Sequence, residues 1–218
     1  MPALTVNTDA IVLLRRPSTS DSFQTFSVFS AEHGEMLVLQ RIAKGGGKKG
    51  RSGGGGGGAA LDLFSEVSLA LESSNQGRTW FVKEARLVKD AGGIGRDYET
   101  LLRASEFAAL IARNTIAVES RGRVHALLRQ VFAAFAGGGG SGLADIIYFK
   151  AVYRFARDEG YALKEQWFAA LPPAERDLAA ALINKPLAEL AAPPPPEAVG
   201  ILRKKLESYL REQTEILM

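Results

Sequence analysis

The segment best suited to chemistry is a glycine-rich stretch, residues 41–58, whose only charges are positive. Flexible cationic side chains can neutralise the phosphates of a nucleic acid without any sequence preference. Because glycine loses the most backbone entropy on ordering, we expect a loop that takes no fixed conformation without a partner. A solvated insertion that only keeps the protein in solution would have the same composition. The candidate phosphate contacts in this stretch are Arg41, Lys44, Lys48, Lys49 and Arg51.

Arg15 and Arg16 are weaker candidates for the same positive surface, because charged residues are also common where a strand ends. Aromatic residues of the first ninety residues could include a platform for base stacking. Most of them must fill the interior of a small β-domain, and the sequence assigns none individually to DNA. They are Phe23, Phe26, Phe29, Phe64, Trp80 and Phe81. The basic triplet Arg203 to Lys205 is more typical of a solvated helix face.

Catalytic, nucleotide-binding and metal-binding patterns do not emerge from the sequence. Gly92 to Gly95 lacks the spacing of a dinucleotide fingerprint, and no Ser or Thr follows Gly45 to Lys48 as a phosphate-binding loop requires. His33 falls in a predicted turn, and His125 lies among arginines without a convergent acid or serine. The absence of cysteine excludes disulfides and thiolate zinc sites. We therefore expect no catalytic residue, no cofactor and no metal, and interpret the protein as a binding protein rather than an enzyme.

The elements that must position the basic residues follow from hydrophobic periodicity. In the first ninety residues apolar and polar residues alternate with a period of two, which predicts strands. Five strands in about ninety residues are the strand count of a small OB-type Greek-key barrel. The predicted strands are 10–14, 23–29, 35–42, 61–72 and 78–88.

From Asp97 onward the period becomes helical, and Asp97 itself is a plausible N-cap. Further helices are expected over 123–135, over 143–159 with Gly160 as C-cap, from Pro172, and after the four prolines 193–196. The predicted fold class is therefore α+β with two domains. We expect residues 1–90 to form an OB-type barrel that binds DNA and residues 91–218 to form an all-helical domain.

Overall charge and hydropathy limit which partners and which cellular location we expect for the protein. There are 27 Lys and Arg residues against 24 Asp and Glu residues, so a nucleic-acid argument must rest on local charge rather than on the net charge of +3. No stretch approaches the ~20 apolar residues that a membrane span needs. The first residues also lack the pattern of a secretory signal. We expect a soluble, cytoplasmic protein without membrane contact.

The order of these features resembles the RecO family of bacterial recombination mediators. The resemblance covers nearly the whole chain and rests on the order and spacing of apolar patterns. It also includes the basic loop after the third predicted strand. The matching segments are Ala10 to Arg16, Phe26 to Ser30, Glu32 to Gly34 leading into Leu37 to Leu39, Leu61 to Phe64, Lys83 to Arg86, Tyr98 to Ser105, and Phe149 to Tyr161.

What the resemblance implies is a non-enzymatic DNA-repair protein of a RecFOR-type pathway, found with the nucleoid in the cytoplasm. Family members bind single- and double-stranded DNA, anneal complementary strands and aid loading of the recombinase RecA. The implied partners are the single-stranded-DNA-binding protein and RecR. The alternative is a protein-interaction scaffold in which the barrel has no DNA affinity and the helical half docks a partner's peptide.

The chain departs from the pattern of the RecO family in metal binding. Many family members carry a four-cysteine zinc module soon after the equivalent of Gly160 and Tyr161, whereas this chain has Trp167 there and is expected to form an apolar helix. The family's zinc, and any partner contact that depends on it, are therefore not carried over. We expect packing alone to hold this region.

Overall fold

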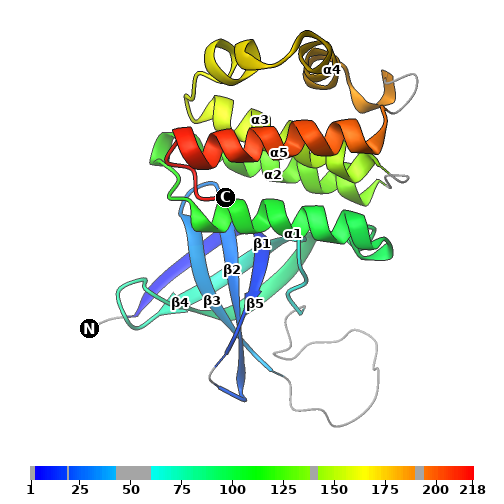
Figure 1. Ribbon diagram of the computed structural model, residues 1–218. Helices are drawn as coiled ribbons and strands as arrows, with labels where there is room; N and C mark the ends of the chain where they lie inside the picture. Colours follow the sequence, from blue (N-terminus) through cyan, green and yellow to red (C-terminus); the bar gives the residue numbers. More distant parts are fainter. Residues whose placement is uncertain (1–2, 19, 43–59, 138–141, 190–193) are drawn as a thin grey trace. The chain divides into compact units, whose positions relative to one another are not determined.

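The computed structural model describes residues 3–18, 20–42, 60–137, 142–189 and 194–218 (Figure 1). Within these ranges a five-stranded sheet is followed by helices, so the fold is α+β. The chain divides into two compact units, Met1–Ala91 and Gly92–Met218. The first unit contains the strands and the second the helices. No helix in the described ranges is long and apolar enough to cross a membrane.

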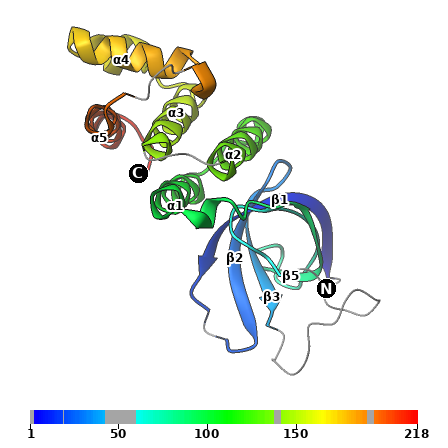
Figure 2. The ribbon, with the colours of Figure 1, turned by 90° about the vertical axis from the view of Figure 1, so that its right-hand side faces the viewer.

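The strands of the first unit form one sheet that closes on itself in the order β1-β2-β3-β5-β4. Closure is completed by the antiparallel pairing of β1 with β4. Only β3 and β5 pair in parallel, and Figure 2 shows the strands wrapped around a common interior. The strands are β1 (Leu4–Arg16), β2 (Phe23–Ser30), β3 (Gly34–Arg41), β4 (Glu66–Ser73) and β5 (Trp80–Lys89).

The interior of this sheet is filled by alternate side chains of the strands. Val12, Val28, Val38, Leu69 and Trp80 all belong to one buried cluster, and each comes from a different strand. Because successive side chains of a strand point to opposite faces, the residues between these positions face outward. The period-two pattern therefore determines which face of the sheet each side chain lies on, although Ile11 and Phe29, which are outside this cluster, are also buried.

The prediction of five strands is confirmed, but two boundaries were wrong. β1 begins at Leu4 rather than residue 10, and β4 begins at Glu66 rather than residue 61. In the segment before β4, Phe64 has a φ of 66° and its backbone N–H donates to the Val12 carbonyl at 2.7 Å. That left-handed residue turns the chain just before the ladder begins, so the apolar residues 61–64 do not continue the strand.

Within the described ranges the second unit consists of five α-helices, three short 3-10 helices and one π-helical turn. Its N-cap prediction is confirmed, because the Asp97 carboxylate accepts a hydrogen bond from the Thr100 backbone N–H at 2.9 Å. Hydrogen bonds from the Thr100 hydroxyl and backbone lower the pKa of Asp97. α3 packs against α1, α2 and α5. The helices are α1 (Tyr98–Arg113), α2 (Arg121–Ala136), α3 (Leu143–Asp158), α4 (Pro173–Asn184) and α5 (Pro196–Gln213).

The segment after Gly160 is not a continuous apolar helix. It contains a five-residue π-helical turn, Lys164–Phe168. Trp167 within this turn is buried, and its ring centroid lies 6.0 Å from the rings of both Phe149 and Tyr153. Aromatic packing against α3 therefore fixes this turn.

Candidate nucleic-acid interface

Three of the seven predicted phosphate contacts lie among the residues that the structure describes. These are Arg15, Arg16 and Arg41, whereas Lys44, Lys48, Lys49 and Arg51 lie outside the described residues. β1 and β3 flank β2 on its two sides, and the pairing register brings the three arginines to the first residues of β2. Arg16 pairs with Thr25, Arg15 with Phe26, and Arg41 with Phe23.

A shallow hollow of about 540 Å³ lies at this end of the sheet, and we call it the arginine hollow. It is lined by Arg15, Arg16, Phe23, Gln24, Ile42 and the β1–β2 turn, including the acidic Asp21. Residue 43 follows Ile42 directly, so the lysine-rich segment leaves the described chain at the edge of this hollow. Arg15 and Arg16 of β1 therefore line the hollow, and Arg41 of β3 directly precedes Ile42 at its edge.

Serine side chains shape the turn between β1 and β2. The Ser18 hydroxyl donates to the Phe23 carbonyl at 2.6 Å, and the Ser20 hydroxyl accepts from the Ser22 backbone N–H at 3.2 Å. Such hydrogen bonds between short polar side chains and nearby backbone are typical of turns. The Ile42 backbone N–H donates to the Ser22 carbonyl at 2.9 Å, which ties the end of β3 to the turn.

The three arginines differ in how available their charges are. The Arg16 Nη2 atom lies 3.3 Å from the Glu35 Oε1 atom, which also accepts from the Ser27 hydroxyl at 2.6 Å. Arg15 and Arg41 are exposed and have no ion-pair partner among the described residues. Arg15 and Arg41 are therefore better placed than Arg16 to meet a phosphate.

Sequence reasoning missed an aromatic pair beside the hollow. The Phe23 and Phe81 rings pack edge to face, with centroids 5.6 Å apart. Alternation with the buried Trp80 could have predicted that Phe81 faces outward. It could not have predicted the parallel pairing of β3 with β5, which places Phe81 beside Leu39.

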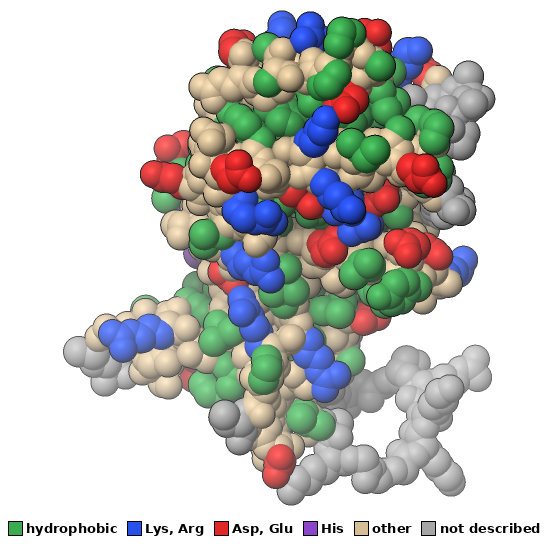
Figure 3. Space-filling model, viewed as in Figure 1, with side chains coloured by type: hydrophobic (Ala, Val, Ile, Leu, Met, Phe, Trp, Pro, Cys, Tyr) green, Lys and Arg blue, Asp and Glu red, His purple; other side chains and the backbone are tan. Residues whose placement is uncertain are grey.

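Positive charges in the helical unit lie among acids, and several of them form ion pairs. On the face shown in Figure 3, Lys and Arg side chains are interspersed with Asp and Glu over the helices. In the basic triplet, Arg203 contacts Glu207 at 2.7 Å and Lys205 contacts Glu175 at 2.6 Å. The expectation of a solvated face is met by the exposed Lys204 and Lys205 but is wrong for Arg203, whose side chain is only 14% exposed.

The two histidines show no metal or catalytic arrangement in the described parts of the chain. His33 is exposed in the turn between β2 and β3, and its Nε2 atom lies 3.6 Å from Glu32. His125 lies on α2 in the other unit. The described residues contain no group of three His, Cys, Asp or Glu side chains placed to hold a metal ion. Neither a known protein-family model nor a curated protein sequence matches this chain.

Proposed function

We propose that the protein binds DNA through the arginine hollow and the lysine-rich segment that follows it, as a non-enzymatic recombination mediator of the RecO type. The observation that carries the proposal is the presence, at one end of the sheet, of two exposed arginines without an ion-pair partner among the described residues. Arg15 lines the hollow, and Arg41 directly precedes Ile42, which also lines it. The four loop cations at residues 44–51 begin only two residues beyond Ile42.

The sheet supports an OB-type assignment. Five strands close in the order β1-β2-β3-β5-β4, with an antiparallel ladder throughout except between β3 and β5. Barrels of the OB type bind oligonucleotides on the face of their second and third strands and on adjoining loops. The arginine hollow lies at the start of β2, the end of β3 and the β1–β2 turn, which corresponds to that surface.

In this proposal the role of the charges is electrostatic. Each arginine or lysine that meets a phosphate displaces a condensed counterion, so binding is independent of sequence and sensitive to salt. The proposal includes annealing of complementary strands and aid to recombinase loading, with the single-stranded-DNA-binding protein and RecR as partners. These roles and the nucleoid-associated location rest on the family resemblance.

A second candidate function, the interaction scaffold, is favoured by a groove in the helical unit. The groove has a volume of about 360 Å³ and is lined by apolar residues of α2, α3 and α4 and by three cations. Lys150 donates to the Lys185 carbonyl at 2.7 Å, and Arg154 donates to Gln130 at 2.6 Å. Arg157 contacts Asp158 at 2.7 Å. The groove would suit a partner's peptide, which is what the scaffold requires.

The two candidates differ in whether DNA binding depends on the loop. The test is fluorescence anisotropy of an unstructured single-stranded oligonucleotide with the wild-type protein and with a variant in which Lys44, Lys48, Lys49 and Arg51 are replaced by serine. A matched control removes the same charge from the helical unit by replacing Arg96, Lys164, Lys204 and Arg211 with serine. DNA binding predicts that affinity collapses in the loop variant and persists in the control. Absent binding, or equal binding by both variants, would favour the scaffold.

A further inference from the structure

An outward-facing strip of side chains crosses β2, β3 and β5 next to the arginine hollow. Phe26, Val38 and Trp80 point into the buried cluster of the sheet. By alternation, Phe23 and Thr25 of β2, Leu39 and Arg41 of β3, and Phe81 of β5 point outward. The register places Phe23 opposite Arg41 and Leu39 beside Phe81, so these residues form one continuous surface.

Phe23 and Phe81 meet across this strip. They come from two strands that do not pair with each other, because β3 lies between β2 and β5. Their centroids are 5.6 Å apart and their planes make an angle of 75°, which is an edge-to-face contact. This geometry makes one aromatic unit from the two rings.

Neither ring is needed to fill the interior. Phe26 and Trp80 belong to the buried cluster, whereas Phe23 and Phe81 do not. Both rings are only partly buried, and Phe23 also lines the arginine hollow. Part of the aromatic surface is therefore open to solvent where the unpaired arginines lie.

We propose that the Phe23–Phe81 pair is a stacking platform for unpaired bases, which gives the protein a preference for single-stranded over duplex DNA. This inference rests on the proposed function and specifies its ligand. Stacking on an aromatic ring is tolerant of sequence, because every base has a π-face. Bases in a duplex are already stacked and paired, so they reach the platform only after being unpaired, which costs free energy.

The neighbouring charges fit this occupant. Arg41 pairs directly with Phe23 in the β2–β3 ladder, and Arg15 lines the same hollow as Phe23. A strand whose base stacks on the rings therefore has cations close by for the adjoining phosphates. Two acids near the rings are already in ion pairs: Glu72, opposite Phe81 in the β4–β5 ladder, with Lys83, and Glu35 with Arg16. Asp21 is the acid among the residues that line the hollow.

The test distinguishes binding to the bases of DNA from binding to its phosphates. Wild-type protein is titrated with oligothymidine of about 16 nucleotides, the upper site size of one OB fold, and with an abasic oligonucleotide of the same length and charge. The platform predicts that oligothymidine binds about tenfold more tightly than the abasic strand, the effect of one stacked base. Phe23→Leu with Phe81→Leu removes the aromatic faces but keeps apolar bulk. This double variant should bind both strands with the affinity of the abasic strand.

Two controls make the result specific. Leu87→Ala changes an exposed apolar residue of β5 six positions beyond Phe81 and should leave the preference for oligothymidine intact. The double variant should also keep the wild-type salt dependence and duplex affinity, because its cations are untouched. Circular dichroism and thermal unfolding of the double variant check its fold, and the wild-type comparison needs no variant at all.

Equal wild-type affinity for the abasic strand and oligothymidine, with normal salt dependence, overturns the platform while DNA binding stands. A double variant that folds and still prefers oligothymidine also overturns it. Absence of binding to either strand overturns the platform together with the proposed function.

Discussion

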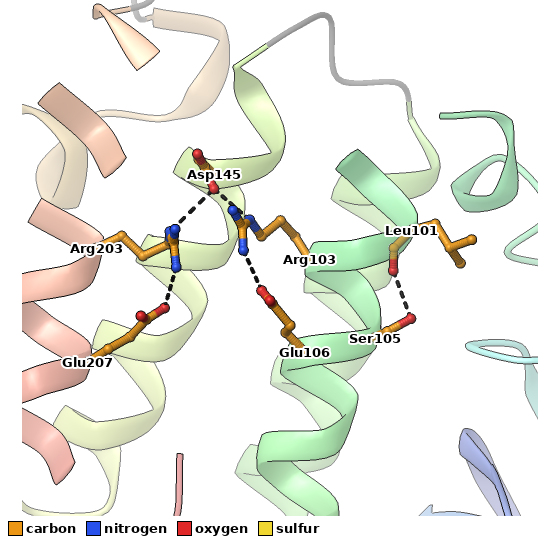
Figure 4. Close-up of polar contacts among 7 residues, drawn as sticks. All are labelled: Leu101, Arg103, Ser105, Glu106, Asp145, Arg203 and Glu207. Atoms are coloured by element: carbon orange, nitrogen blue, oxygen red, sulfur yellow. Dashed lines mark hydrogen bonds and ion pairs between the residues drawn. The ribbon is translucent and has the colours of Figure 1, made fainter. Parts of the chain in front are cut away.

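Replacement of Asp145 should destabilise the helical unit more than loss of any surface ion pair. Asp145 on α3 accepts a hydrogen bond from Arg103 of α1 at 2.6 Å and lies 3.4 Å from the Nε atom of Arg203 on α5 (Figure 4). Each arginine also binds an acid of its own helix, Glu106 at 2.6 Å and Glu207 at 2.7 Å. Asp145 is therefore the one acid in this network that links three helices.

The size of this destabilisation follows from the burial of the two arginines that Asp145 contacts. The side chains of Arg103 and Arg203 are only 11% and 14% exposed, so Asp145→Ala would leave two poorly solvated guanidinium groups without their shared acid. Removal of one partner from a fully buried ion pair costs about 3–5 kcal/mol. Each arginine here keeps its second acid, and Asp145 is itself 21% exposed. We therefore expect a loss of about 2–3 kcal/mol in the free energy of unfolding, the range for hydrogen bonds to charged groups.

The assay is urea unfolding followed by the helical circular-dichroism signal. Glu175→Ala is the matched control, because it breaks a single ion pair to Lys205 between side chains that are 28% and 43% exposed. Such pairs contribute about 1 kcal/mol or less. The reasoning would be refuted if the free energy of unfolding of Asp145→Ala lay within about 0.5 kcal/mol of wild type, which is the effect of an ordinary surface substitution. It would also be refuted if the two variants lost the same amount.

Other predictions concern the interface and the packing. Arg15→Ser with Arg41→Ser should make the log–log salt slope of single-strand binding shallower by about 1.4, from roughly 0.7 for each phosphate. Arg16→Ser should barely change that slope because Arg16 is paired with Glu35; a larger effect for Arg16 would reverse the ranking. Trp167→Ala should cost about 3 kcal/mol or more in a urea titration. Trp167→Phe should cost much less, because the buried indole N–H has no partner in the described chain. Asp97 has a pKa below its ordinary 3.8. Its stabilising effect should therefore be full above that value and be lost as the pH falls through the lowered pKa. Asp97→Asn, which keeps a cap, should remove this part of the acid dependence of thermal unfolding.

Local features of the fold could be predicted from the sequence. The alternation of Val67, Leu69 and Leu71 marked a strand whose inner face is buried, and Asp97 marked the start of α1. Both signals act within a few residues, because side-chain period and capping depend on local geometry. The left-handed conformation of Phe64 carries no such signal, so the start of β4 was misplaced.

Contacts between residues far apart in the sequence could not be predicted from local patterns. The parallel pairing of Leu39 with Phe81 joins residues far apart in the sequence. The ion pair of Arg16 with Glu35 likewise depends on register across strands. The π-helical turn around Trp167 depends on packing against α3. Charge and glycine content therefore indicated the candidate interface, whereas the aromatic pair beside it emerged only from the folded chain.

The most direct test of DNA binding is the salt dependence of wild-type affinity for an unstructured single strand. If the five cations of residues 41–51 all meet phosphates, the log–log slope should be about −3.5, from roughly −0.7 for each neutralised phosphate. A steep slope near that value supports phosphate binding by these residues. A slope near zero, or no binding at low salt, would contradict the proposed function.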